Sequence, residues 1–100
     1  MSLSLERLRD SGWIPAIVER WIPGANIRLD AWGIADIIAA KPPDGRLLVQ
    51  ATTKSNVSAR LKKIKASPYT AKLLASGLAI QVWGWHKKGN RWQCEVRDVS

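Results

Sequence analysis

Residues 28–54 read RLDAWGIADIIAAKPPDGRLLVQATTK, and this stretch decides the fold. Two apolar runs, residues 34–40 and residues 47–51, flank a Pro-Pro-Asp-Gly turn. Apolar runs that are bounded by turn residues predict adjacent buried strands. The connection over residues 41–46 is short, which predicts an antiparallel hairpin. The first run carries Asp36 in its middle, and buried strands hold a charged group only where that group is partnered or used.

The part of the chain before this stretch predicts a helix, a strand and a loop. Leucines at helical spacing, followed by a glycine, predict a helix over residues 2–10. The next segment is compatible with either a helix or a strand, and we expect a strand over residues 16–21. That strand would hold Glu19 among apolar neighbours. Residues 22–29 contain Pro-Gly-Ala-Asn and predict a loop.

The part of the chain after this stretch predicts helices followed by a second hairpin. Ser55 or Asn56 is placed to cap a helix with an apolar line along one face, and Ser67-Pro68 restarts a helix. The inward residues expected on the second helix are Tyr69, Leu73 and Leu74. An apolar strand over residues 78–86, a Gly-Asn turn and an alternating strand over residues 92–97 predict the hairpin. Together these elements predict one α/β domain over residues 1–100, with a mixed sheet of about five strands.

The charge of the chain is strongly basic and unevenly distributed. The formal net charge is +8, and 46% of the residues are hydrophobic, as in an ordinary globular protein. Between Gly45 and Cys94 there are ten Lys or Arg residues and no Asp or Glu. A basic helix face is often only a solvated face, but solvated faces normally mix both signs of charge. We therefore expect a polyanionic partner, most commonly a nucleic acid, whose phosphates the basic residues contact. The residues expected to contact phosphates are Arg60, Lys62, Lys63 and Lys65 on the helix, and Lys87, Lys88 and Arg91 at the second hairpin.

The content of cysteine and histidine excludes several classes of protein. One cysteine, Cys94, rules out an internal disulfide, and with one histidine, His86, it leaves no zinc site of the usual kind. Cys94 alternates with apolar residues, which predicts an inert buried thiol. The chain starts without a signal-like apolar segment and has no apolar run of membrane-spanning length. We therefore expect a cytoplasmic protein with no membrane partner.

Six tryptophans and no phenylalanine are an unusual aromatic content. Trp13, Trp21 and Trp92 are predicted to lie in the core. Trp83 and Trp85 would share one strand face, in the core or at an interface. A dimer surface and a base-stacking platform are alternatives for this pair.

Polar residues on the two central strands predict a metal site. Magnesium prefers hard oxygen ligands, often one or two carboxylates with waters and a substrate phosphate. Asp36 on the first strand and Gln50 on the second would supply such oxygens. Because strand side chains alternate, Gln50, Thr52 and Lys54 would project from the same face. The remaining acids that would reach this site are Glu19 and Asp30.

Four stretches of the chain resemble the PD-(D/E)XK nuclease superfamily, in particular its small Holliday-junction-resolvase-like members from phages and prophages. These stretches are VERW, RLDAWGIADIIA, VQATT and NVSAR, at residues 18–21, 28–39, 49–53 and 56–60. The resemblance extends over nearly the whole chain. It implies a restriction-endonuclease-like core, a DNA substrate, a symmetric dimer, and a location in a bacterial host or phage-infected cell.

The resemblance also assigns roles to individual residues. Asp36 matches the metal-binding aspartate, and Glu19 resembles an extra acid that some members carry. Gln50 stands where the second acid is usual, and Thr52 stands where the lysine is usual. The implied metal, Mg²⁺ or Mn²⁺, would be held by Asp36 and Gln50.

The two neutral replacements leave the activity open. One alternative is an endonuclease in which Lys54 stabilises the charge of the transition state. Another is a catalytically inactive nucleic-acid-binding module with the same fold. A third is an assembly subunit that uses the tryptophan-rich hairpin.

Overall fold

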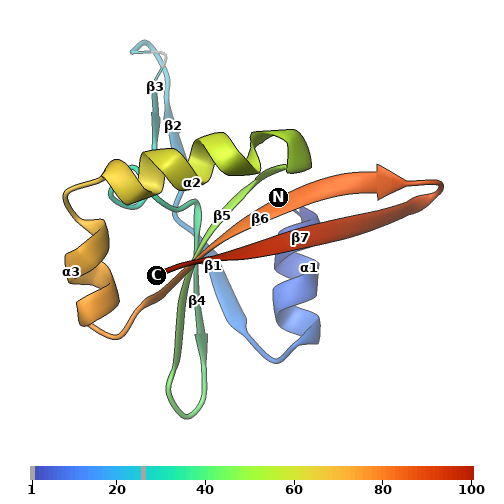
Figure 1. Ribbon diagram of the computed structural model, residues 1–100, viewed down its shortest axis with the longest axis horizontal. Helices are drawn as coiled ribbons and strands as arrows, with labels where there is room; N and C mark the ends of the chain where they lie inside the picture. Colours follow the sequence, from blue (N-terminus) through green and yellow to red (C-terminus); the bar gives the residue numbers. More distant parts are fainter. Residues whose placement is uncertain (1, 26) are drawn as a thin grey trace.

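A five-stranded mixed sheet forms the centre of the molecule, and helices pack on both of its faces (Figure 1). The computed structural model describes residues 2–25 and 27–100, without the side chains of residues 2, 21, 22 and 27–29. The strands are β1 (Ile14–Ile17), β2 (Arg20–Ile22), β3 (Ile27–Leu29), β4 (Ile37–Lys41), β5 (Gly45–Thr53), β6 (Ala79–Lys88) and β7 (Arg91–Val99). The helices are α1 (Ser2–Asp10), the 3₁₀ helix η1 (Lys54–Asn56), α2 (Val57–Ala66) and α3 (Thr70–Ala75). Of the helices described, none combines the length and the apolar character of a membrane span.

The strand order of the sheet is β1-β4-β5-β6-β7. The predicted hairpins are both confirmed, because β4 pairs antiparallel with β5 and β6 pairs antiparallel with β7. The β5 and β6 strands run parallel, and η1, α2 and α3 form the long crossover that parallel neighbours require. The expected α/β class with a mixed sheet of five strands is therefore confirmed.

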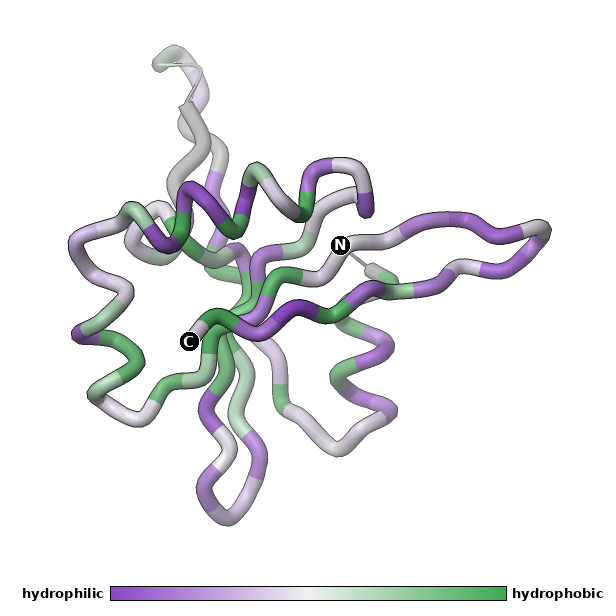
Figure 2. Tube along the Cα trace, viewed as in Figure 1, coloured by the Kyte–Doolittle hydropathy of each residue, from purple (hydrophilic) through white to green (hydrophobic). Residues whose placement is uncertain are grey.

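The core has two layers, one on each face of the sheet. Leu48 and Val49 are consecutive on β5, so their side chains point to opposite faces. Leu48 joins a buried cluster with Ile64 of α2, whereas Val49 joins a second cluster with Leu8 of α1. Figure 2 shows the hydrophobic colours concentrated where the central strands cross, and hydrophilic colours toward the end of the β6–β7 hairpin. The helices thus bury both faces of β5 at its centre, which explains the uninterrupted apolar run Leu47, Leu48 and Val49.

The first helix ends where the sequence predicts and is attached to the sheet by a side-chain hydrogen bond. Gly12 has a positive φ of 88°, and the Trp13 amide donates to the carbonyl of Leu8 at 2.9 Å. This geometry is typical of a glycine-terminated helix. Ser4 is fully buried, and its hydroxyl oxygen accepts a hydrogen bond from Trp85 Nε1 at 2.8 Å. Helix α1 is therefore fixed to β6.

The single strand predicted over residues 16–21 is wrong, because the chain leaves the sheet after β1. Directly after β1, the Val18 amide donates to the carbonyl of Asp36 at 2.9 Å. The chain then starts β2, which pairs with β3 in a separate two-stranded ribbon. Glu19 consequently lies between two strands and not inside one.

The loop predicted over residues 22–29 is also wrong, because its second half forms β3. Strands β2 and β3 pair antiparallel, and Gly24 in their connection has a φ of 87°. A residue with positive φ favours glycine and suits a tight connection between paired strands. The Pro-Gly signal thus marks a hairpin turn, and the ribbon projects away from the five-stranded sheet (Figure 1).

The predicted helix after residue 67 is confirmed, with one error in its inward face. Leu73 and Leu74 pack against the core as expected, but Tyr69 is exposed. Tyr69 precedes the first turn of α3, and its amide donates to the Ser67 hydroxyl oxygen. Thr70 turns inward instead, and its hydroxyl donates to the carbonyl of Ile64.

The tryptophans divide between the core and the surface. Trp83 is buried, and Trp13 and Trp85 pack partly buried against the same cluster. The core position predicted for Trp92 is wrong, since 52% of its surface is exposed. Trp92 pairs with Lys87 near the free end of the β6–β7 hairpin, which extends past the helices (Figure 1). The core position predicted for Trp21 concerns a side chain that lies outside the part of the chain described by the structure.

Cys94 lies on β7 and packs half-buried against the α1-side cluster. Burial raises the pKa of its thiol, which keeps the thiol protonated near neutral pH. The predicted apolar environment of this cysteine is therefore confirmed, although the side chain is not fully buried.

Candidate carboxylate site and basic surface

Asp36 lies in a bend directly before β4, and not in the middle of a strand as predicted. The preceding chain makes a tight turn closed by a bridge between Ala31 and Ala35. Strand pairing with β5 therefore starts at Ile37, one residue after Asp36. The Asp36 amide donates to the carbonyl of Val49 at 3.0 Å. Its carboxylate oxygen Oδ1 accepts a hydrogen bond from the Ala51 amide at 3.1 Å. The two bonds hold Asp36 and its carboxylate at the start of β4, next to a pocket.

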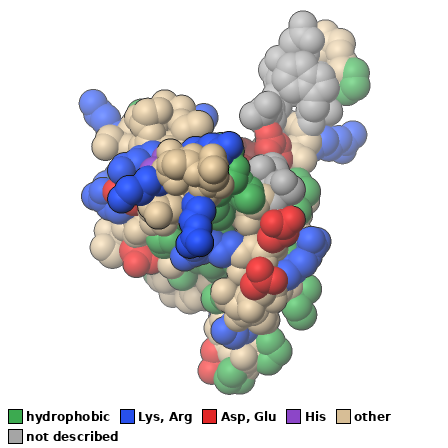
Figure 3. All heavy atoms as spheres, turned by 90° about the vertical axis from the view of Figure 1, so that its right-hand side faces the viewer, with side chains coloured by type: hydrophobic (Ala, Val, Ile, Leu, Met, Phe, Trp, Pro, Cys, Tyr) green, Lys and Arg blue, Asp and Glu red, His purple; other side chains and the backbone are tan. Residues whose placement is uncertain are grey.

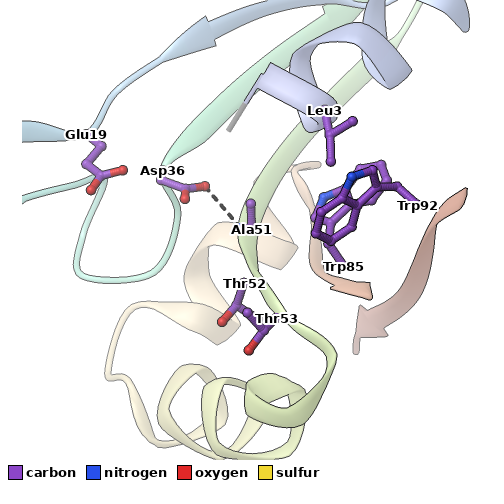
Figure 4. Close-up of a pocket in the computed structure, with 8 residues that line it drawn as sticks. All are labelled: Leu3, Glu19, Asp36, Ala51, Thr52, Thr53, Trp85 and Trp92. Carbon is purple, nitrogen blue, oxygen red and sulfur yellow. Dashed lines mark hydrogen bonds between the residues drawn. The ribbon is translucent and has the colours of Figure 1, made fainter. Parts of the chain in front are cut away.

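The pocket next to Asp36 has a volume of about 480 Å³. It is lined by Leu3, Glu19, Asp36, Ala51, Thr52, Thr53, Trp85 and Trp92. These residues come from α1, the break between β1 and β2, the bend before β4, and strands β5, β6 and β7 (Figure 4). The pocket therefore combines a carboxylate side with a wall of two indoles.

Among the predicted site residues, Glu19 is an acid that lines the same pocket as Asp36. It is half-buried. In Figure 4 the Glu19 carboxylate points toward Asp36, whose own carboxylate points toward Ala51. The break after β1 directs Glu19 to this position. Two carboxylates that are distant in sequence thus lie at one pocket.

Burial changes the acidity of Asp36. Only 6% of this residue is exposed, and desolvation is the main cause that raises its pKa from 3.8 to about 6. The negative charges of Glu19 and Asp30 raise the pKa further, while the hydrogen bond from the Ala51 amide lowers it. A raised pKa means that the surroundings stabilise the ionised carboxylate less well than water does. Such groups are frequent at functional sites.

This raised pKa predicts a pH-dependent difference in stability between the wild type and Asp36→Asn. The folded state binds the Asp36 proton more tightly than the unfolded chain does, so the contribution of Asp36 to the free energy of unfolding falls as pH rises from about 4 to about 6. Asparagine still accepts the Ala51 hydrogen bond without carrying a charge. We expect the variant to match the wild type at about pH 4 and to exceed it by up to about 2 kcal/mol above pH 6.5. Urea unfolding across this range measures the difference, and Asp44→Asn at the exposed β4–β5 turn is the control. A constant difference at all pH values would contradict the prediction.

Gln50 and Thr52 occupy different positions relative to this pocket. Gln50 is 8% exposed, lies in register with Val82 of β6, and does not line the pocket. Thr52 lines it, and Figure 4 shows its hydroxyl directed away from Asp36. The two candidate metal ligands at this pocket are therefore Asp36 and Glu19. The sequence predicts Asp36 and Gln50 instead.

Lys54 does not project from the strand face predicted for it, because β5 ends at Thr53. Lys54 is the first residue of η1, a turn in which the Asn56 side-chain amide donates to Thr53 Oγ1 at 3.1 Å. Lys54 lines a second pocket of about 500 Å³ together with Thr53, Ser55, Trp85 and His86. Thr53 and Trp85 line both pockets, so Lys54 is adjacent to the carboxylate pocket but outside it.

The basic residues predicted to contact DNA are exposed at two places. Lys62, Lys63 and Lys65 are exposed on α2, where Arg60 is half-buried. The end of the β6–β7 hairpin exposes Lys87, Lys88 and Arg91, which we call the hairpin-end basic group. Lys and Arg side chains gather on the surface nearest the viewer in Figure 3, where this hairpin ends.

Comparisons with protein-family models, curated proteins and solved structures found no match to this chain. Within residues 2–25 and 27–100 there is no group of three or more His, Cys, Asp or Glu residues arranged to hold a metal ion. A metal at this site would therefore be held by two carboxylates at most, with other ligands from water or substrate. Sequence patterns missed Leu3 and Trp92 as site residues, because both come from elements that only the tertiary fold brings to the pocket.

Proposed function

We propose that this protein binds DNA and cleaves phosphodiester bonds with the help of one divalent metal ion, in the manner of a small PD-(D/E)XK-like nuclease. The observation that carries the proposal is the pairing of Asp36 with Glu19 in one pocket, on a chain whose exposed surface is strongly basic. A divalent cation bound between the two carboxylates would offset their repulsion of DNA phosphates.

The side chains present fit Mg²⁺ or Mn²⁺. These ions take one or two carboxylates and complete their coordination with waters and phosphate oxygens. Glu19 replaces Gln50 as the proposed second ligand, since Glu19 lines the pocket and supplies a charged oxygen. A bound ion would favour the ionised form of Asp36 and so offset the effect of its burial. When bound, such an ion activates water and neutralises charge on the phosphate.

The chain itself supplies orientation and positive charge. The Ala51 amide fixes the direction of the Asp36 carboxylate by a hydrogen bond of 3.1 Å. Lys54, on the far side of Thr53, is the nearest lysine along β5 and η1 to the pocket. With its long stem, Lys54 would contact a phosphate of DNA bound across both pockets, where its charge would stabilise the transition state.

The second candidate is a DNA-binding module that no longer cleaves. The position of Lys54 in a separate pocket, and a neutral Thr52 in place of a lysine, favour it. Incubation of the wild type with single-stranded, duplex and four-way-junction DNA distinguishes the two, with Mn²⁺ in one arm and EDTA in the other. Cleavage only with Mn²⁺ supports the nuclease. Binding without cleavage of any substrate supports the module, and absence of binding contradicts both.

Phosphate contacts by the hairpin-end basic group predict a specific dependence on salt. Each phosphate that a lysine neutralises contributes a slope of about −0.9 to the plot of log affinity against log salt concentration. Lys88→Ala should therefore make the slope shallower by about 1. Lys72→Ala on α3, an exposed lysine away from the hairpin, is the control and should leave the slope unchanged. Fluorescence anisotropy of a labelled duplex over a salt series measures both, and equal slopes for the two variants would exclude a phosphate contact by Lys88.

A further inference from the structure

Trp92 is an exposed indole in an unusual place. It lies on β7 beside the hairpin-end basic group, yet it also lines the carboxylate pocket. More than half of its surface, 52%, is exposed. Tryptophan combines a large apolar ring with a polar N–H group, and it is enriched at interfaces where one part of the ring is packed and another is accessible.

The surroundings of Trp92 form a fixed aromatic wall. Trp85 lines the same pocket, and its Nε1 donates to the buried Ser4 hydroxyl at 2.8 Å, which holds the ring in place. Register places Trp92 opposite Lys87 and Trp85 opposite Cys94, so both indoles lie on the same face of the hairpin. Figure 4 shows the two rings together, across the pocket from Glu19 and Asp36.

Positive charge accompanies this wall. The Lys87 ammonium lies 5.9 Å from the centroid of the Trp92 ring, and Lys88 and Arg91 follow at the end of the hairpin. A positive groove combined with aromatic faces is the usual arrangement for binding single-stranded nucleic acid. The volume of about 480 Å³ falls within the range of about 300–1,000 Å³ typical of small-molecule sites, so it is sufficient for one nucleotide.

From this geometry we infer that Trp92 is a stacking platform for an unpaired base, and that the preferred substrate is DNA with single-stranded nucleotides. This inference rests on the proposed function, because it specifies the substrate of the same pocket. A base inside a duplex has both faces covered by its neighbours, whereas an unpaired base offers a face to an indole. With the base on Trp92, its phosphate would extend across the pocket toward Asp36 and Glu19.

The test is DNA binding in EDTA, so that the result does not depend on metal or on cleavage. Anisotropy compares a labelled single strand with the blunt duplex of the same sequence. The variants are Trp92→Ala, Trp92→Phe and, as a control of the same residue type, Trp32→Ala, since Trp32 is 47% exposed and does not line the pocket. We expect Trp92→Ala to weaken single-strand binding about tenfold to a hundredfold, and to affect duplex binding much less. Trp92→Phe retains an aromatic face and should keep most of the affinity.

Each outcome has a definite meaning. Tight duplex binding with no specific effect of Trp92→Ala overturns this inference and leaves DNA binding intact. Trp92-dependent single-strand binding without cleavage in Mn²⁺ supports the inference and rejects the nuclease. A dimer that dissociates on Trp92→Ala, with no effect on single strands, would assign the indole to a self-interface and overturn the inference.

A second measurement avoids substitution, in case Trp92→Ala destabilises the hairpin. An oligonucleotide with 5-iodouracil, irradiated in complex with the wild type, crosslinks to aromatic side chains that stack on the base. We expect the crosslinked peptide to contain Trp92. Crosslinks confined to other peptides would overturn the inference.

Discussion

Asp36→Asn is expected to reduce Mn²⁺-dependent cleavage of DNA by about a hundredfold or more. Asparagine has nearly the same shape and still accepts the hydrogen bond from the Ala51 amide, so the bend before β4 is retained. It lacks the negative charge that holds a hard divalent ion, and metal-dependent hydrolysis fails when the ion is lost. The rate of product formation under single-turnover conditions measures the effect.

Matched variants make this result specific. Asp44→Asn removes an exposed carboxylate at the β4–β5 turn, outside the pocket, and should cleave like the wild type. Glu19→Gln removes the second proposed ligand and should also lower the rate. DNA affinity in EDTA should not fall in either pocket variant, because each removes a negative charge. Full activity of Asp36→Asn would exclude the carboxylate site as the source of cleavage.

Gly84→Ala is expected to destabilise the protein by about 2–3 kcal/mol. Gly84 is buried on β6, where a Cβ atom would overlap Val57 Cγ2 and would lie 3.0 Å from Lys54 Cα. The second contact is with backbone, which cannot move away as a side chain can. Overpacking of this kind costs about 2–3 kcal/mol, and each kcal/mol shifts the Tm of a domain of this size by about 4–8 °C. Thermal unfolding followed by circular dichroism measures the shift.

A double-mutant cycle identifies the cause of the stability lost in Gly84→Ala. Val57→Ala removes the methyl groups that meet the new Cβ, so Gly84→Ala should cost less in the Val57→Ala background than in the wild type. Part of the cost should remain, because the approach to Lys54 Cα is unchanged. Additive effects of the two substitutions would show that the contact with Val57 is not the cause. An unchanged Tm in Gly84→Ala would contradict the close packing of α2 on β6.

Local patterns in the sequence predict the fold well where they are strong and do not depend on contacts with distant parts of the chain. The two apolar runs around the Pro-Pro-Asp-Gly turn predict β4 and β5 and their antiparallel pairing, because turn chemistry and burial act within the same short segment. The break between β1 and β2 could not be predicted in this way. It depends on where β1 stops pairing with β4, which is a tertiary property.

The site is predictable in part for the same physical reason. Asp36 stands out because a charge inside an apolar run requires a partner or a use. Its partner Glu19 is brought near by the break after β1. The strand face predicted for Lys54 is wrong because β5 ends one residue before it, and strand ends are poorly determined by sequence. The core position predicted for Trp92 is wrong because α1 covers only part of that strand face.

Titration of Mn²⁺ into the protein, with free ion followed by electron paramagnetic resonance, tests the metal site most directly. At about pH 7.5 Asp36 is ionised, since its pKa is about 6. The carboxylate pair predicts one bound ion per chain in the wild type, and none at this site in Asp36→Asn or Glu19→Gln. Binding of the ion should also weaken as pH falls below 6. Absence of Mn²⁺ binding in the wild type, or equal binding by Asp36→Asn, would contradict a metal site at Asp36 and Glu19.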